Sequence, residues 1–117
     1  MDQRNVFRIM LGFLFSHELD ATLRHEWRVL PITSFLPDEF GQLVFIWLHV
    51  PLFFLILSFM GNSKFRNVMA LFSVIHVGLH WIFRNHPDYE FNNLSSWSLI
   101  LGAGFFGTAF LAMRPRD

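Results

Sequence analysis

The stretch LVFIWLHVPLFFLILSFM, from Leu43 to Met60, is 18 residues long, and His49 and Ser58 are its only clearly polar members. Two further apolar runs follow it, at residues 68–83 and 97–113. A helix that crosses a membrane needs about 20 predominantly apolar residues, or fewer where flanking side chains reach back to the interface. A soluble domain of 117 residues would not carry three such runs. The runs therefore indicate an integral membrane protein.

The composition agrees with this class and excludes several others. Hydrophobic residues make up 53% of the chain and charged residues only 15%, against about 45–50% and about 25% in soluble globular proteins. Nine Lys and Arg balance nine Asp and Glu, so the basic excess of a nucleic-acid-binding protein is absent. Because the sequence has no cysteine, disulfide bonds, Cys-ligated zinc and thiol catalysis are excluded.

The N-terminal segment is apolar at first and amphipathic later. Its apolar run from Ile9 to Phe15 continues without a helix breaker until Pro31, which predicts one helix over about residues 4–29. The sequence thus predicts a single all-α domain, an integral membrane bundle of four helices. The predicted spans are about 4–29, 42–60, 66–84 and 95–113. Pro51 predicts a kink in the second span, and the small residues at 102–108 predict close helix packing of the fourth.

The charged residues predict the orientation of the bundle. With four spans, the N-terminus, the turn at 61–66 and the C-terminus lie on one side of the membrane. That side carries six basic and two acidic residues, a net charge of +4: Arg4, Arg8, Lys64, Arg66, Arg114 and Arg116 against Asp2 and Asp117. The opposite side carries three basic and seven acidic residues, a net charge of −4. Because cytoplasmic loops are enriched in Lys and Arg, we expect both termini in the cytoplasm.

The same topology brings four histidines to the middle or outer half of the bundle. His76 and His80 have the i, i+4 spacing that allows two imidazoles on one helix to reach a single centre. Ionisable side chains at membrane depth normally face the bundle interior, where they pair or bind a ligand. The sequence therefore predicts an outward-opening polar pocket. Its lining would be His17, Glu18, Asp20, Arg24, His49, His76 and His80.

One interpretation of this pocket is a transition-metal site for zinc or iron, because imidazoles and carboxylates are the ligands that these ions use. The ligands would be His17, His49, His76 and His80. Glu18 or Asp20 would be a further ligand or general base of a membrane hydrolase or redox enzyme, and Arg24 would pair with an anion or carboxylate. The zincin motif H-E-x-x-H is not met, because Ala21 stands where the second histidine belongs. A haem would need two facing imidazoles, which His49 and His76 could supply.

The other interpretation is a structural network without chemistry. Asp20 can pair with Arg24, Glu18 can pair with Arg84, and the histidines can bond to free backbone carbonyls. The protein would then be a non-catalytic accessory subunit of a larger photosynthetic or respiratory membrane complex. In either case its surroundings are the lipid bilayer.

Two neighbouring features are less informative. Glu26 falls outside the polar face of the first helix, so we expect it in solvent together with His25. The segment 86–90 either caps the pocket or forms a solvated turn.

A family resemblance supports the layout. The segments HELDA at 17–21, HEWRVLP at 25–31, LHVPLF at 48–53 and NHPDYEF at 85–91 resemble those of a family of small four-span bacterial membrane proteins of unknown function, found in cyanobacteria among others. The resemblance covers most of the chain. It implies the four-helix layout, and a bacterial inner membrane or thylakoid-type membrane is the expected location, but it supplies no activity.

Overall fold

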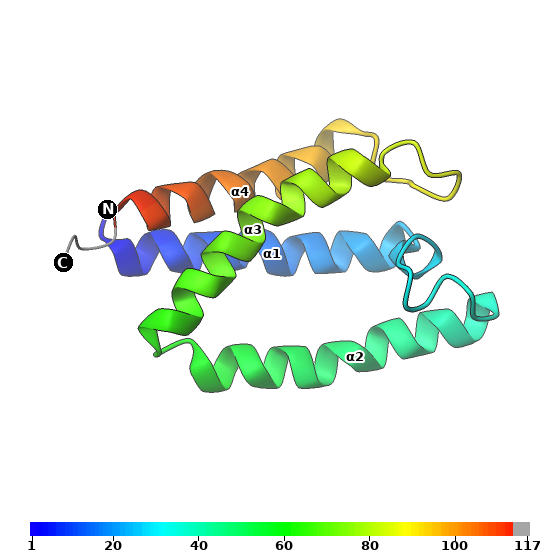
Figure 1. The fold of residues 1–117 in the computed structure, drawn as a ribbon, viewed down its shortest axis with the longest axis horizontal. Helices are drawn as coiled ribbons and strands as arrows, with labels where there is room; N and C mark the ends of the chain where they lie inside the picture. The colour runs from blue at the N-terminus through cyan, green and yellow to red at the C-terminus, as the bar shows by residue number, and fades with distance from the viewer. Residues whose placement is uncertain (114–117) are drawn as a thin grey trace.

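The computed structural model describes residues 1–113, which form four long helices and one short one (Figure 1). The elements are α1 (Gln3–Leu23), the 3-10 helix η1 (Glu26–Arg28), α2 (Asp38–Phe59), α3 (Ser63–Phe83) and α4 (Leu94–Met113). The described residues contain no strand, so the all-α prediction is confirmed for them. Arg114, Arg116 and Asp117, which contribute to the predicted charge asymmetry, lie outside the described residues.

Three helices, α2, α3 and α4, are long and apolar enough to cross a membrane. Their most apolar segments have mean hydropathies of 2.1, 1.2 and 1.5. The helix α1 is not among these candidates, and it carries Arg4, Arg8, Glu18 and Asp20. The apolar composition is consistent with a membrane location, whereas a crossing by α1 stays a prediction.

The core of the molecule lies between α1, α3 and α4. The helices α1 and α4 run antiparallel and pack along their whole length (Figure 1). Phe7 packs against Phe110 at one end, with ring centroids 5.4 Å apart, and Ser96 Oγ donates to Asp20 Oδ2 at 2.5 Å near the other end. The helix α3 packs on α4, so α4 contacts both of its neighbours.

Small residues bring α3 and α4 together. A Cβ atom built on Gly104 would lie 2.5 Å from Val77 Cγ2, and one built on Gly107 would lie 2.8 Å from the carbonyl oxygen of Ala70 and closer still to Ser73 Oγ. Neither position has space for a side chain. The close packing that the small residues predicted for the last helix is present.

The helix α2 lies beside this three-helix core. It contacts η1 at one end and joins α3 through a short turn at the other, and a gap separates its middle from α1 in the ribbon view (Figure 1). Between the two ends, Phe53 packs on Phe15 with ring centroids 5.6 Å apart. The helix continues through Pro51 without a break.

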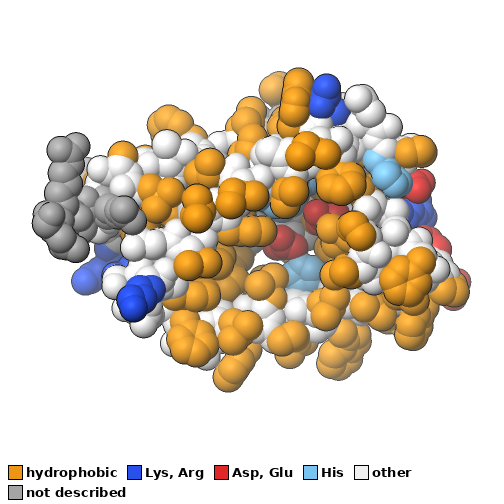
Figure 2. Space-filling view, viewed as in Figure 1, with side chains coloured by type: hydrophobic (Ala, Val, Ile, Leu, Met, Phe, Trp, Pro, Cys, Tyr) orange, Lys and Arg blue, Asp and Glu red, His pale blue; other side chains and the backbone are white. Residues whose placement is uncertain are grey.

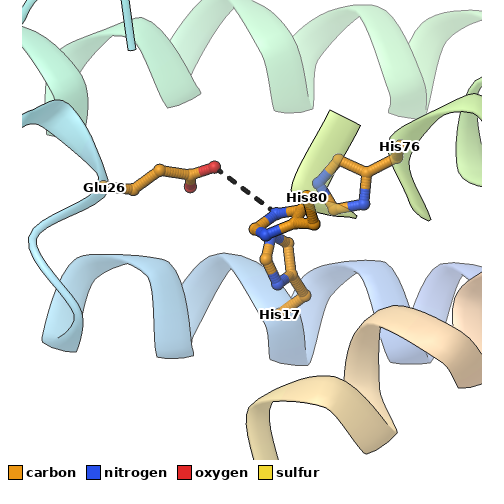
Figure 3. A group of neighbouring side chains, drawn as sticks. All are labelled: His17, Glu26, His76 and His80. Carbon is orange, nitrogen blue, oxygen red and sulfur yellow. Dashed lines mark ion pairs between the residues drawn. The ribbon is translucent and has the colours of Figure 1, made fainter. Parts of the chain in front are cut away.

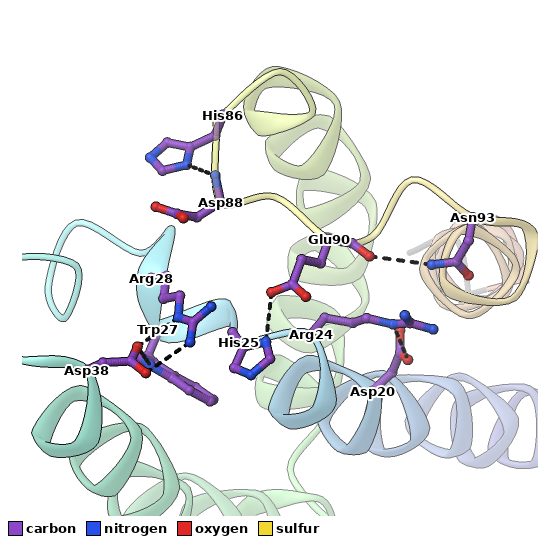
Figure 4. A network of polar contacts seen from close by, with 10 residues as sticks. All are labelled: Asp20, Arg24, His25, Trp27, Arg28, Asp38, His86, Asp88, Glu90 and Asn93. Atoms are coloured by element: carbon purple, nitrogen blue, oxygen red, sulfur yellow. Dashed lines mark hydrogen bonds and ion pairs between the residues drawn. The ribbon is translucent and has the colours of Figure 1, made fainter.

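The first helix is shorter than predicted, because α1 ends at Leu23 and not near Val29. His25 adopts a left-handed backbone conformation with φ of 57°, which a helix cannot contain. Contacts beyond the helix hold the new direction: His25 Nδ1 lies 2.7 Å from Glu90 Oε2, and the buried Trp27 donates to Asp38 Oδ1 at 2.9 Å (Figure 4).

Candidate metal centre

Three histidines and one glutamate meet between α1, η1 and α3 (Figure 3). Each side chain offers one ligand atom, and these atoms all lie within 4.8 Å of one another. The ring centroids of His17 and His76 are 4.5 Å apart, and those of His76 and His80 are also 4.5 Å apart. We call this group, His17, Glu26, His76 and His80, the histidine–glutamate cluster.

Ordinary helix geometry places the three imidazoles. His76 and His80 are one turn apart on α3 and face α1, as their spacing predicted. His17 on α1 faces both of them, at 4.5 Å and 4.9 Å between ring centroids. Phe91 from the loop before α4 covers the cluster and packs against His17 and His80. All three histidines are buried, His17 completely.

Several ring nitrogens of the cluster lack a hydrogen-bond partner. Both nitrogens of His17 and Nδ1 of His76 are buried without one, and residues 1–113 contain no other such buried side-chain atom. Buried polar atoms are almost always paired, and an unpaired one costs about 1–3 kcal/mol. A cation bound between the rings would pair with one nitrogen of His17 and one of His76, since the two nitrogens of one imidazole point in different directions.

Tyr89 holds the third imidazole in place. Its hydroxyl lies 2.9 Å from His80 Nδ1. When Nδ1–H donates to the Tyr89 oxygen, Nε2 keeps its lone pair for a metal ion, an arrangement common around metal-bound histidines. Burial raises the pKa of Tyr89, so the phenol stays uncharged. The segment 86–90 therefore contributes one side chain to the site, while Asp88 remains exposed.

The fourth member, Glu26, was expected in solvent, and that expectation was wrong. Its side chain is only 13% exposed, and Oε1 lies 3.8 Å from His80 Nε2. Burial, assisted by the nearby Glu18 carboxylate, raises the pKa of Glu26 to about 8. Glu26 points inward because α1 ends early and His25 reverses the chain direction. No glycine, proline or asparagine marks that reversal, so the sequence contained no signal for it.

His49 and Glu18 form a separate pair. His49 Nε2 lies 2.5 Å from Glu18 Oε2, and its Nδ1 bonds to the carbonyl oxygen of Phe45 at 2.7 Å. Both ring nitrogens are therefore occupied, and His49 is outside the histidine–glutamate cluster. The pair joins α2 to α1 across the cavity that borders the cluster. The predicted ion pair of Glu18 with Arg84 is not formed, because Arg84 lies over the ring of Trp81, 3.7 Å from its centroid.

Asp20 and Arg24 lie away from the cluster. Arg24 Nε is 3.3 Å from Asp20 Oδ1, which confirms the predicted i, i+4 pair. The other carboxylate oxygen accepts from Ser96, so Asp20 ties α1 to α4. Neither residue lines the cavity beside the cluster. Of the acidic residues expected in the site, Glu18 alone faces it.

Polar contacts fix the end of the molecule next to the site (Figure 4). Arg28 donates two hydrogen bonds to Asp38, at 2.7 and 2.9 Å, and so joins η1 to the start of α2. The His25–Glu90 contact joins the end of α1 to the loop before α4. These bonds hold the two segments that carry Glu26 and Tyr89.

A cavity of roughly 280 Å³ borders the cluster, between α1, η1, α2 and α3. Glu26, His76 and His80 line it together with the Glu18–His49 pair, and the other walls are mainly leucine and phenylalanine. In the space-filling view, acidic and histidine side chains are visible at the bottom of a hollow surrounded by hydrophobic ones (Figure 2). A molecule in the cavity would reach the cluster directly.

The cluster has the donors of a first-row transition-metal site. Three imidazoles and one carboxylate suit zinc or ferrous iron. At the usual bond lengths of about 2.0–2.1 Å, tetrahedral ligand atoms lie about 3.3 Å apart. The present spread of up to 4.8 Å is wider, so small side-chain rotations would be needed to close the group around an ion.

Comparison with known proteins places the chain in a family but does not name an activity. No curated protein and no solved structure matches it. The resemblance of its motifs predicted membership of a family of unknown function. A family match extends over residues 3–117, which is nearly the whole sequence, and the chain belongs to the family of unknown function DUF6713.

Proposed function

We propose that the protein is an integral membrane metalloprotein that binds one zinc or iron ion through the histidine–glutamate cluster. The observation that carries the proposal is the set of three buried, unpaired ring nitrogens on His17 and His76, next to the carboxylate of Glu26. A divalent ion would pair with one nitrogen of each histidine and would favour the charged form of the buried carboxyl.

A contrast within the chain favours metal binding over a purely structural network. His25, His49 and His86 each have a hydrogen-bond partner for at least one ring nitrogen. A network that serves only to stabilise the fold would be expected to satisfy the most deeply buried imidazole first. His17 is completely buried and has no partner at either nitrogen.

The proposed membrane arrangement has four spans, with both termini in the cytoplasm. Support for a crossing by α1 comes from its antiparallel packing along the whole of α4, a helix apolar enough to span a membrane. The charged residues of α1 that would lie within the membrane have partners: Glu18 pairs with His49, and Asp20 pairs with Arg24 and Ser96. Such pairing is how ionisable groups are accommodated at membrane depth.

A catalytic role is the next step of the proposal. Glu18 lines the cavity beside the cluster and is the acidic residue best placed as a general base toward a molecule there. Asp20 serves the α1–α4 interface instead through its bond with Ser96, and Arg24 pairs with Asp20. The ion would supply Lewis-acid or redox chemistry, and Glu18 with His49 would accept or release a proton.

Metal analysis of detergent-purified protein tests the proposal. A preparation with a histidine-free affinity tag is expected to hold about one zinc or iron ion per chain. The double variant His76→Ala/His80→Ala should lose it, and Glu26→Gln should weaken binding at least about tenfold, since even the loss of a residue behind the ligands costs 10–100-fold. The matched controls are His86→Ala and Glu39→Gln, which alter the same residue types outside the cluster.

Two results would contradict the proposal. One is wild-type protein that neither carries a metal nor takes up Zn²⁺ or Fe²⁺ after purification. The other is a control that loses the ion as fully as the cluster variants do. Circular dichroism of each variant shows whether the helices are retained, so that loss of metal can be separated from loss of fold.

A further inference from the structure

The cavity beside the cluster opens through the side of the molecule. Its mouth lies between α2 and α3, near the middle of each helix, since His49 and His76 occupy the central turns of these elements. The middle of α2 packs closely on neither α1 nor α3, and the exposed residues of the lining all lie on α2 and α3, so the cavity opens on this side. For helices that cross a bilayer, a mid-helix opening faces hydrocarbon.

The mouth of the cavity is apolar on both sides. Leu48 and Leu52 of α2 and Phe72 and Leu79 of α3 line it, and each is between 39% and 44% exposed. The polar groups are confined to the inner end, where the cluster and the Glu18–His49 pair lie. A pocket with an apolar entrance and a polar end matches a molecule with an apolar tail and a polar head.

The charges of the inner end select the head group. A divalent ion held with the single carboxylate of Glu26 leaves a net charge of +1, because the three imidazoles bind as neutral groups. Glu18 and His49, sharing one proton, add no net charge. An uncompensated charge at membrane depth is costly, so a ligand with one negative charge is favoured over a neutral or doubly charged one.

We infer that the cavity binds a single-chain amphiphile with a monoanionic, metal-ligating head group of the fatty-carboxylate type, which enters from the bilayer between α2 and α3 and would become a fifth ligand of the ion. The inference rests on the proposed metal site and adds the class of substrate. A volume of roughly 280 Å³ is just below the range of small-molecule pockets, which span about 300–1,000 Å³. It accommodates the head and the first carbons of the chain, and the rest of the chain extends toward lipid.

Hydroxamates of different chain length test the inference, because they ligate metals as monoanions. Protein loaded with Co²⁺ would be titrated with octanohydroxamate and with acetohydroxamate while the visible spectrum of the ion is followed. Octanohydroxamate is expected to bind at least about tenfold more tightly, since burial of two extra methylene groups is sufficient for that factor.

Two matched variants separate the cavity from general partition into detergent. Leu52→Trp narrows the mouth and should weaken octanohydroxamate binding at least about tenfold, while acetohydroxamate binding changes less than about twofold. Leu55→Trp is the control, because Leu55 lies one turn further along α2, is similarly exposed and does not line the cavity. Leu79→Trp repeats the test from α3 if the first variant does not fold.

The outcomes distinguish the two proposals. The amphiphile inference would be overturned, and the metal site left intact, if the protein binds cobalt and acetohydroxamate but binds octanohydroxamate no more tightly. The same holds if Leu52→Trp and Leu55→Trp bind octanohydroxamate with equal affinity. Absence of any cobalt spectrum in the wild type would overturn the metal site, and the inference with it.

Discussion

His17 is completely buried, yet neither of its ring nitrogens has a hydrogen-bond partner. Such a side chain lowers the stability of the folded protein unless a ligand binds to it, because an unpaired buried polar atom costs about 1–3 kcal/mol. Nearby, Tyr89 and Glu26 flank His80 but do not reach His17. Of the three histidines in the cluster, His17 is therefore the one whose burial a bound ion would stabilise most.

The variant His17→Met should therefore have opposite effects without and with metal. In the presence of a chelator, an apolar side chain of similar volume removes the unpaired nitrogens and should raise the free energy of unfolding by about 1–3 kcal/mol. With saturating Zn²⁺ the wild type should gain stability, and the variant should lose most of that gain. Thermal unfolding in detergent under both conditions provides the measurement. His86→Met, in the loop, is the control; a His17 variant that is destabilised under both conditions would contradict the metal interpretation.

The sequence could predict part of the site at this scale. The i, i+4 spacing of His76 and His80 and the polar face that carries His17 are local patterns, and the structure brings these three residues together. Glu26 could not be predicted, because its inward direction depends on the left-handed conformation of His25. The separate pairing of His49 could not be predicted either, since it depends on how far α2 stands from the core.

At the scale of elements, apolar runs predict helices well and their ends less well. The helices α2, α3 and α4 begin and end within about four residues of the predicted ranges, because long apolar runs bounded by turn residues leave few alternatives. The end of α1 was missed by about six residues. There, contacts distant in sequence, such as the bonds of Trp27 and Arg28 to Asp38, determine the backbone.

The contact of α3 with α4 positions two members of the cluster, His76 and His80, and Gly107→Ala should disturb it. The new Cβ would meet Ser73 Oγ and the backbone oxygen of Ala70, and a backbone atom cannot move aside cheaply. We expect a loss of about 1–3 kcal/mol in the free energy of unfolding, as for overpacked cores, together with weaker metal binding, because Ser73 lies one turn before His76.

A matched glycine provides the control for that experiment. A Cβ on Gly12 of α1 has no atom within 4 Å. Gly12→Ala should therefore be neutral or stabilise by up to about 1 kcal/mol through helix propensity, with metal binding unchanged. Chemical unfolding and metal titration of both variants give the comparison. Equal stability of the two variants would show that α3 and α4 are not held by close contact at Gly107.

At the scale of the whole molecule, the open question is whether α1 crosses the membrane, because its amino-acid composition does not decide this. Its charged residues keep it out of the set of apolar spanning helices, while its packing along α4 requires the two helices to share one environment. The Phe7–Phe110 and Asp20–Ser96 contacts lie at opposite ends of this pair. Separating α1 from α4 would expose the aromatic rings that pack between them, such as Phe7 and Phe110, and would break the hydrogen bond between Asp20 and the buried Ser96.

Single-cysteine labelling tests the resulting topology. The experiment needs no prior removal of cysteines, because the sequence contains none. We expect Asn5→Cys and Ser63→Cys to react with a membrane-impermeant maleimide from the cytoplasmic side, because two crossings separate the N-terminus from the α2–α3 turn and place both on the same side. Ser34→Cys and Ser95→Cys should react from the opposite side. Sealed vesicles of both orientations provide the measurement, and the cysteine-free parent gives the background. If α1 lay on the membrane surface, Asn5→Cys would label with Ser34→Cys instead, and the four-span arrangement would be wrong.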